Sequence, residues 1–517
     1  MKSACFSLLA CALIGTLAIG QPKPGDPPKP GDPPKIGTPG TDPKDKPPET
    51  PKLPSDDPLL KDALKHFEKN EIKECMAKLK EATDKNKDLQ PPEVIFASWL
   101  VQVRRGSDAR QVLEQFIARN PGHPDGYLLN ASFAYGEGRV TDAIQNCLSA
   151  LNYSTRGSAQ WNTSQQQRFE REARLGLVAS LEARGDFPNM VEHVQALVNA
   201  DPKNAALRQR LAAVKFNVGQ DATALDELRK AFEIDTAIDP PELRIGALWA
   251  SKAATKTGKT PEETADMQKK EIEENRKEAE KFLNQAVQKF NTNAKAPRGL
   301  ASFYLEEGKF KEALTFINQA SDLDKKEGKK EETRETKSLR ALYHRYMGVT
   351  SGAEAEKKEA VKLFEELFTQ NPSDPFATGN LAICLMETGE KERANNLANT
   401  LVKGNDKSAE AYAVLGWVLF RNAEKETDDK KKKELYESAD QAFGRAASSG
   451  QAMLDTGYYI AENLNQKKKY KEAFDLLKDA VGKKGAFVYR TKAADLLEKV
   501  KPLVPKDEPK PEEKKAP

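Results

Sequence analysis

The sequence predicts an all-α solenoid, a stack of paired helices in which one helix–turn–helix unit recurs along most of the 517-residue chain. Three observations predict it. Related segments such as GKFKEALTFINQA (308–320) and KKYKEAFDLLKDA (468–480) belong to a series with a period of 34 residues. Within each copy, apolar residues recur at spacings of four and seven, which place them on one face of a helix. Small residues and glycines recur upstream, where a first helix would pack and end.

The repeat is defined by one position, which we call the anchor and which is the alanine of the KEA sequence in both segments. Six of the ten intervals between successive anchors are 34 residues, and the other four are longer by 11, 13, 13 or 21 residues. A fixed period with occasional insertions indicates a repeat array. The eleven anchors are Cys75, Ala109, Ala143, Met190, Ala224, Ala279, Ala313, Ala360, Ala394, Ala439 and Ala473.

Other positions of the repeat support this alignment. Every residue four or seven positions after an anchor is apolar, although only 38% of the chain is hydrophobic. Alanine recurs twelve residues before the anchors, which implies that a neighbouring helix crosses closely there. A glycine five residues before the anchor can adopt the left-handed conformation that ends the first helix, and a proline twelve residues after it stops the second. These residues are Gly138, Gly185, Gly219, Gly308 and Gly389, and Pro121, Pro202 and Pro372.

A 34-residue helix–turn–helix with these residues at these offsets resembles the tetratricopeptide repeat. In the seventh copy Gly308, Ala313 and Ala320 match the pattern, with Leu300, Ala301 and Tyr304 upstream. The resemblance covers about residues 56–482, although no copy is perfect. The departures are Lys215 at a position where an apolar residue is expected, and the degenerate first copy around Cys75.

The resemblance implies a right-handed superhelical solenoid of about eleven repeats, in which the first helix of each pair lines an inner groove. The amphipathic segment FVYRTKAADLLEKV (487–500) predicts a capping helix within 483–500 that covers the open end of the array. Polar insertions predict solvated loops or helix extensions. They lie at about 152–166, 257–270, 324–331 with 348–355, and 422–433.

The two ends of the chain differ from the array. Residues 1–20 combine Lys2 with an uncharged apolar run that ends at Gly20, which predicts a secretory signal cleaved near Gly20. The alternative is a lipoprotein signal with Cys11 as the anchored residue. Residues 21–55 hold 13 of the 31 prolines and predict a disordered, extended linker, and 501–517 a disordered tail of the same kind. We therefore expect an extracytoplasmic protein, periplasmic or secreted, of the bacterial cell envelope, with no membrane span in the mature chain.

Motifs for catalysis or metal binding do not emerge. The four histidines include no HExxH pair, and the sequence TGKT (257–260) lacks the earlier glycine of a phosphate-binding loop, because that residue is Ala253. The near balance of 82 basic and 79 acidic residues predicts no nucleic-acid partner. Cys75, Cys147 and Cys384 predict no disulfide framework. We therefore expect no cofactor, no metal and no enzymatic activity.

The resemblance instead implies a protein–protein interaction scaffold that binds a peptide or a helix of a partner in its groove. Trp417 beside Arg421 is the main candidate contact, and the alternative is that Trp417 packs against the next repeat. Other functions that stay open are an envelope structural protein that binds glycan or peptidoglycan, and an accessory subunit of an envelope enzyme. The candidate partner-binding residues are Tyr135, Arg298, Glu306, Ile383, Met386, Trp417, Phe420 and Arg421.

Overall fold

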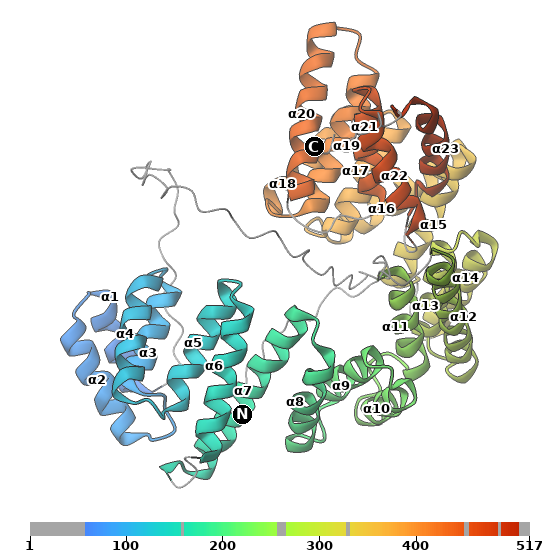
Figure 1. The fold of residues 1–517 in the computed structure, drawn as a ribbon. Coiled ribbons are helices and arrows are strands. Elements are labelled where there is room, and N and C mark those ends of the chain that lie inside the picture. The colour runs from blue at the N-terminus through green and yellow to red at the C-terminus, as the bar shows by residue number, and fades with distance from the viewer. Residues whose placement is uncertain are drawn as a thin grey trace, which may run out of the picture. The chain divides into compact units, whose positions relative to one another are not determined.

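The structure is a computed structural model that describes residues 57–156, 160–255, 265–326, 331–448, 454–483 and 487–505 (Figure 1). These residues form 23 α-helices and one short 3-10 helix, and none of them lies in a strand. The predicted signal, the linker 21–55 and the sequence TGKT lie outside the described residues, as does most of the predicted tail. The predicted all-α repeat solenoid is confirmed.

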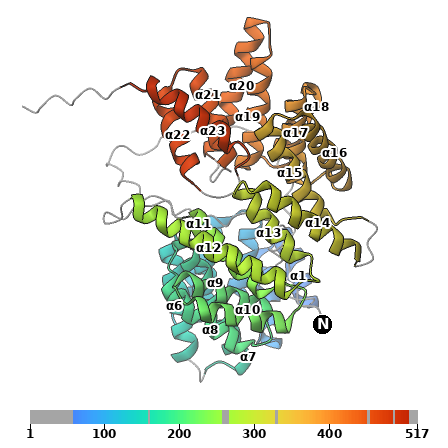
Figure 2. The ribbon, with the colours of Figure 1, turned by 90° about the vertical axis from the view of Figure 1, so that its right-hand side faces the viewer.

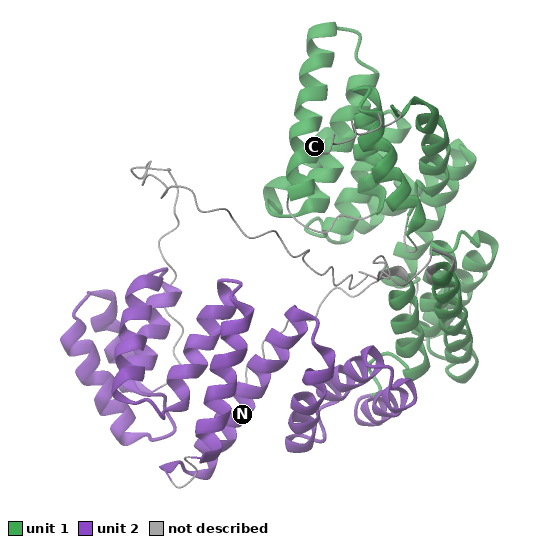
Figure 3. Cartoon of the chain, viewed as in Figure 1, with its two compact units in different colours: residues 1–20, 236–517 green, residues 21–235 purple. Residues whose placement is uncertain are grey.

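The described chain divides into two compact units, residues 57–235 and residues 236–505 (Figure 3). In chain order, the first unit is residues 57–235 (purple, labelled unit 2 in Figure 3), and it contains five helix pairs. Its helices are α1 (Pro58–Glu68), α2 (Ile72–Lys85), α3 (Pro92–Gln102), α4 (Gly106–Arg119), α5 (Pro124–Gly136), α6 (Val140–Arg156), α7 (Thr163–Arg184), α8 (Phe187–Ala200), α9 (Ala205–Asn217) and α10 (Asp221–Ile234).

The second unit contains six pairs, a final helix α23 and the 3-10 helix η2, and its helices stack in chain order (Figure 2). They are α11 (Pro241–Thr255), α12 (Ala265–Lys289), α13 (Lys295–Glu306), α14 (Phe310–Lys326), α15 (Arg334–Ser351), α16 (Glu354–Gln370), α17 (Pro375–Thr388), α18 (Lys391–Gly404), α19 (Ala409–Glu424), α20 (Asp429–Ser448), α21 (Leu454–Gln466), α22 (Tyr470–Gly482), α23 (Arg490–Val500) and η2 (Lys501–Leu503).

The anchors form the buried seam of each pair. All eleven lie on the second helix of a pair, and each is at most 1% exposed. The residues four and seven positions later are buried as well, from Leu79 and Ala82 in α2 to Leu477 and Ala480 in α22. Alanine at the anchor lets the backbones of the two helices approach closely, while the larger residues on the same face fill the core.

The turn between the two helices of a pair depends on a left-handed residue. All five glycines predicted for this role have positive φ angles, between 72° and 96°. The same position is also left-handed in three copies that have no glycine there, at Asn70 (φ 60°), Arg104 (φ 62°) and Lys468 (φ 58°). The glycines therefore predict the turn correctly in five copies, but three further copies form the same turn without a glycine.

The insertions lengthen helices where the structure describes them. α12 and α20 have 25 and 20 residues, whereas the second helices without an insertion, such as α2, have about 14. The prolines act as predicted, because α4, α8 and α16 each end two residues before Pro121, Pro202 and Pro372. Helix extension is thus confirmed as the role of the inserted residues in α12 and α20.

Lys215 is accommodated by charge pairing. Its ammonium lies 3.4 Å from a carboxylate oxygen of Glu227, which also accepts hydrogen bonds from Arg208 at 2.8 Å and Lys230 at 3.1 Å. Burial opposes ionisation of Glu227, but these cations outweigh it and lower the pKa of its carboxyl group. The repeat tolerates a lysine at an apolar position because three cations share one buried acid.

Candidate partner-binding faces

The first helices form the inner side of each unit. α3 contacts α5 and α5 contacts α7, and in the other unit α11, α13 and α15 form such a series, as do α17, α19 and α21. The second helices contact mainly the first helices on either side of them. A stack in which the first helices approach each other most closely curves toward them, so their free sides face inward.

The inner side of residues 57–235 presents three exposed apolar side chains, which we call the N-terminal inner face. Val101 on α3 is 38% exposed, Tyr135 on α5 is 45% exposed and Leu175 on α7 is 36% exposed. Val101 and Tyr135 stand eight residues before their anchors and Leu175 fifteen, and a difference of seven keeps them on one helix face. They are three of only nine large apolar residues that are exposed in the described chain.

A salt bridge borders this face. Glu182 of α7 stands at the same repeat position as Tyr135 of α5, and its carboxylate pairs with the guanidinium of Arg210 on α9. Both charged side chains are partly exposed. The face therefore passes from an apolar strip on α3, α5 and α7 to a polar edge on α9, which suits an amphipathic segment of a partner.

Of the eight candidate partner-binding residues, only Tyr135 lies on the N-terminal inner face. The other seven lie in the second unit, and the structure shows them in three different environments. Arg298 donates a hydrogen bond to Asp324 at 3.0 Å, and Asp324 also accepts from the hydroxyls of Thr333 and Thr336. Because Asp324 is fully buried, this network holds α13, α14 and α15 together, which is a packing role for Arg298.

Glu306 lies in a confined ionic site at the end of α13. Its carboxylate is 3.8 Å from the guanidinium of Arg276, which also pairs with Glu307 and covers the ring of Phe303 at 4.4 Å. Burial raises the pKa of Glu306 to about 7, with a further contribution from Glu307 and opposition from Arg276. This carboxyl group therefore changes charge near neutral pH.

Ile383, Met386, Trp417 and Phe420 are between 0% and 4% exposed, so they do not line a free surface as the sequence suggested. These four side chains are buried because other side chains of the same unit occupy its inner side. Trp417 stacks on Tyr459 at 4.4 Å, with 17° between the rings, as the packing alternative predicted. Arg421 stays half-exposed above the Trp417 ring, at 5.4 Å, and pairs with Glu424.

The inner side of the second unit is occupied by a cluster of buried side chains that was not predicted from the sequence. We call it the inner cluster, and it consists of Arg345, Glu387, Trp417, Asp455, Tyr459 and Tyr489. These residues come from α15, α17, α19, α21 and the segment before α23. Arg345 donates a hydrogen bond to the hydroxyl of Tyr459 at 3.2 Å and lies 3.5 Å from the carboxylate of Asp455. Burial raises the pKa of Asp455, and the charge of Arg345 opposes this.

Little in the sequence predicts the inner cluster. Arg345 lies in a helix that follows an insertion, so its place relative to the repeat was uncertain. Tyr489 belongs to the segment that the sequence assigned to a capping helix. The adjacent pair Tyr458 and Tyr459 was the one usable hint, because two large rings in a first helix leave little room for a groove.

The described residues offer little for catalysis. No group of three or more His, Cys, Asp or Glu residues in the described ranges is placed to hold a metal ion. Burial raises the pKa of Cys75 to about 11 and the pKa values of Cys147 and Cys384 to about 12, so these thiols stay protonated and are poor nucleophiles. A cavity of about 310 Å³ beside α20 is lined largely by charged side chains, among them Asp429, Lys433 and Lys467. None of the described helices is long and apolar enough to cross a membrane.

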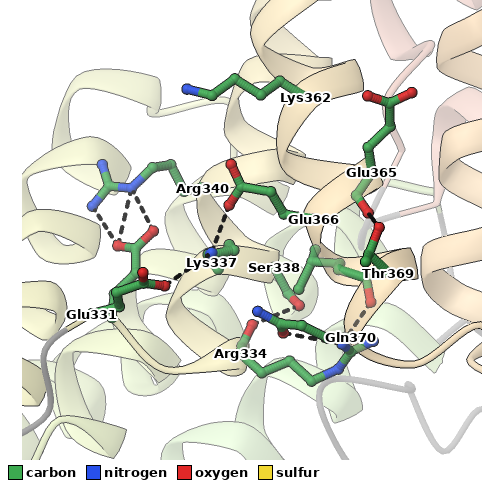
Figure 4. A network of polar contacts seen from close by, with 12 residues as sticks. Glu331, Arg334, Lys337, Ser338, Arg340, Lys362, Glu365, Glu366, Thr369 and Gln370 are labelled. Carbon is green, nitrogen blue, oxygen red and sulfur yellow. Dashed lines mark hydrogen bonds and ion pairs between the residues drawn. The ribbon is translucent and has the colours of Figure 1, made fainter.

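A network of polar contacts between α15 and α16 also has a packing role (Figure 4). Lys337 of α15 donates to Glu366 of α16 at 2.6 Å and lies 3.7 Å from Glu331. Arg334 donates to the carbonyl oxygen of Leu367 at 2.8 Å. The network therefore fastens α15 to α16 by paired charges.

Comparisons with known proteins agree with the helix pairs. Residues 272–329 and 356–418 match one family model described as a tetratricopeptide repeat, and residues 97–160 match another of the same description. No curated protein sequence matches the chain.

Three similar solved structures illustrate the range of proteins with this kind of helix pair. Yeast Tom70 is 12% identical, with 86% of this chain and 95% of that chain covered and a TM-score of 0.33. A tetratricopeptide repeat protein from Parabacteroides merdae is 15% identical, with 57% and 99% covered and a TM-score of 0.36. YrrB, described as having an unusual peptide-binding site, is 17% identical, with 43% and 96% covered and a TM-score of 0.28.

TM-scores of this size carry no information about function, so the assignment depends on the sequence matches and on the observed pairs. The matched segments fall in both compact units, and each covers helix pairs with a buried anchor. The chain therefore contains tetratricopeptide repeats in residues 97–160, 272–329 and 356–418.

Proposed function

We propose that the chain is a non-catalytic scaffold that binds a segment of a partner protein along the N-terminal inner face. The observation that carries the proposal is the exposure of Val101, Tyr135 and Leu175 on one face of three consecutive first helices. Exposed apolar side chains that share a face and are bordered by charged residues are typical of interaction sites. An amphipathic segment, with apolar residues toward α3 and α5 and a polar end toward Glu182 and Arg210, would complement it.

The energetic expectation centres on Tyr135. Aromatic residues near the middle of an interface are frequent hot spots, where truncation costs about 2 kcal/mol or more. A loss of that size corresponds to a dissociation constant raised by about 30-fold. Val101 and Leu175 are smaller, and we expect each to contribute less than Tyr135.

A peptide selection with the full chain tests the proposal. Peptides selected from a displayed library would be re-measured against Tyr135→Ser and Leu175→Ser, with Leu148→Ser as the matched control, because Leu148 is similarly exposed (40%) but lies on the second helix α6. We expect Tyr135→Ser to weaken binding by about 30-fold and Leu148→Ser by less than about twofold. Selected peptides that bind all three variants equally would place the binding site elsewhere and refute the proposal.

We also propose that the chain works outside the cytoplasm, in a bacterial cell envelope. Support comes from the sequence of residues 1–20, with Lys2 before an uncharged apolar run. Mass spectrometry of the purified protein would decide the point. A chain that begins at Gln21 agrees with cleavage near Gly20, a lipid-modified Cys11 would show membrane anchoring, and a chain that retains Met1 would contradict export.

A further inference from the structure

Residues 487–489, just before α23, lie on the inner side of the second unit. The backbone N–H of Phe487 donates to the hydroxyl of Tyr346 on α15 at 3.1 Å. The backbone N–H of Tyr489 donates to Asp455 on α21 at 3.3 Å, and its hydroxyl donates to Glu387 on α17. Main-chain and side-chain groups of this short segment are thus bound by three different first helices.

The rings of the segment are enclosed by aromatic residues. Tyr489 stacks on Tyr458 at 5.0 Å with 14° between the rings, and it meets Trp417 and Tyr459 edge-on at 5.7 Å and 5.3 Å. Tyr489 is 1% exposed and Phe487 3% exposed. Trp417, Tyr458 and Tyr459 therefore enclose the Tyr489 side chain.

Arg490 follows Tyr489 and lies above the Phe487 ring at 5.1 Å. Burial, together with the charge of Arg276, lowers the pKa of its guanidinium, although Glu307 and Asp455 act in the opposite direction. The guanidinium also donates to the carbonyl oxygen of Lys483, at the end of α22, at 2.8 Å. Arg490 therefore holds its own segment against α22, and the groups that enter the inner side are the two aromatic side chains.

A capping helix alone does not account for these contacts. α23 packs on α22 through buried residues such as Ala493 and Leu496, which is the contact that a cap needs. In a repeat array each unit contacts only its neighbours, so a cap reaches no further than the last pair. Phe487 and Tyr489 instead bind residues 141 and 102 positions earlier in the chain, on α15 and α17.

We propose that residues 487–489 are an intramolecular ligand of the second unit, and that their site recognises partner segments of the form aromatic–any–aromatic. A partner with such a segment gains access by displacing Phe487–Tyr489. The proposal rests on the proposed scaffold function and extends it to a second site with a defined ligand chemistry.

The test converts the internal ligand into a free one. A site-specific protease sequence inserted between Lys483 and Phe487 allows the purified full chain to be cut there, and the released fragment to be removed by gel filtration. A labelled peptide of residues 487–505 is then added back and its binding followed by fluorescence anisotropy. We expect the cut chain to keep its helical circular dichroism and to rebind the peptide saturably.

Variant peptides distinguish a ligand role of the segment before α23 from a capping role of α23. We expect Tyr489→Ala to weaken rebinding by about 30-fold, since it empties an aromatic pocket, and Lys499→Ala on the exposed side of α23 to change it by less than about twofold. Residues 485–492 alone should compete with the labelled peptide, and a scrambled peptide of the same composition should not. Glu387→Gln in the cut chain should weaken rebinding by about five- to tenfold, because the tyrosine hydroxyl loses a charged acceptor.

Three results would overturn the proposal. The cut chain could lose its helical structure when the fragment leaves, which would make the segment an integral part of the fold. Tyr489→Ala could rebind as well as the unchanged peptide while Leu496→Ala alone fails, which would reduce the segment to a cap. Residues 485–492 could fail to compete. The scaffold proposal is tested separately, by peptide binding to the Tyr135 and Leu175 variants of the first unit. Failure of one proposal can therefore be told apart from failure of the other.

Discussion

The position five residues before the anchor is left-handed in eight of the eleven copies, and it allows the backbone cost of a turn to be measured by substitution in both directions. Lys468 and Arg104 hold φ angles of 58° and 62° and are exposed. A non-glycine residue in this conformation costs about 1–2 kcal/mol, whereas glycine costs about 0.5–1 kcal/mol through the entropy of the unfolded chain. Lys468→Gly and Arg104→Gly should therefore each stabilise their helix pair by about 0.5–1 kcal/mol.

The reverse substitution is available at Gly308, where φ is 72° and an added Cβ would meet no atom within 4 Å. Gly308→Ala should destabilise by about 1 kcal/mol through the backbone alone. The free energy of unfolding of Lys468→Gly would be measured by urea titration, with hydrogen exchange of the backbone amides in α21 and α22 as the readout. Lys467→Gly is the control. Lys467 has no positive φ, so glycine there should be neutral or destabilising. The reasoning fails if Lys468→Gly destabilises, or if Gly308→Ala has no effect.

Three further outcomes follow from burial and packing. The folded protein holds the Glu306 proton up to about pH 7 while the unfolded chain releases it near 4.5, so the free energy of unfolding should fall by up to about 3 kcal/mol between about pH 5 and pH 8. Glu306→Gln should remove most of that slope in urea titrations, and an unchanged slope would contradict the assignment. A Cβ on Gly416 would lie 2.6 Å from the Phe443 ring, so Gly416→Ala should cost about 1–3 kcal/mol, whereas Gly444→Ala on open α20 surface should be neutral or stabilising in the same thermal assay. Iodoacetamide at about pH 8 should label Cys384 only in denaturant, because burial raises its pKa to about 12, and fast labelling of the folded protein would show that α17 opens.

Much of the fold could be predicted from the sequence because the same packing positions recur in every copy of a repeat. A single alanine says little, but eleven anchors with apolar residues four and seven positions later define the second helix of every pair. The three left-handed residues that are not glycine were not predicted. Asparagine favours this conformation, so Asn70 offered a weak signal, whereas Arg104 and Lys468 are residue types that rarely adopt it. Their turns are imposed by the packing of the helices on either side.

The binding faces were less accessible to sequence reasoning. Repeat position placed Tyr135, Trp417 and Phe420 on the inner side, and of these only Tyr135 is exposed, whereas Trp417 and Phe420 are buried. The difference is non-local, since it depends on Tyr489 returning to residues more than a hundred positions earlier. Repeat periodicity predicts contacts between neighbouring helix pairs, and it contains no information about a contact between residues so far apart in the chain.

The return of residues 487–489 bears on where the chain can be cut for expression. Residue 482 is the natural end of the repeat count, and a gene fragment designed from repeats alone would stop there. Such a fragment would lack Tyr489 and leave the aromatic rings of Trp417, Tyr458 and Tyr459 uncovered beside the buried charge of Arg345. Uncovered rings of this kind promote self-association. A fragment that ends after η2, at about residue 505, would retain both the cap and the enclosed tyrosine.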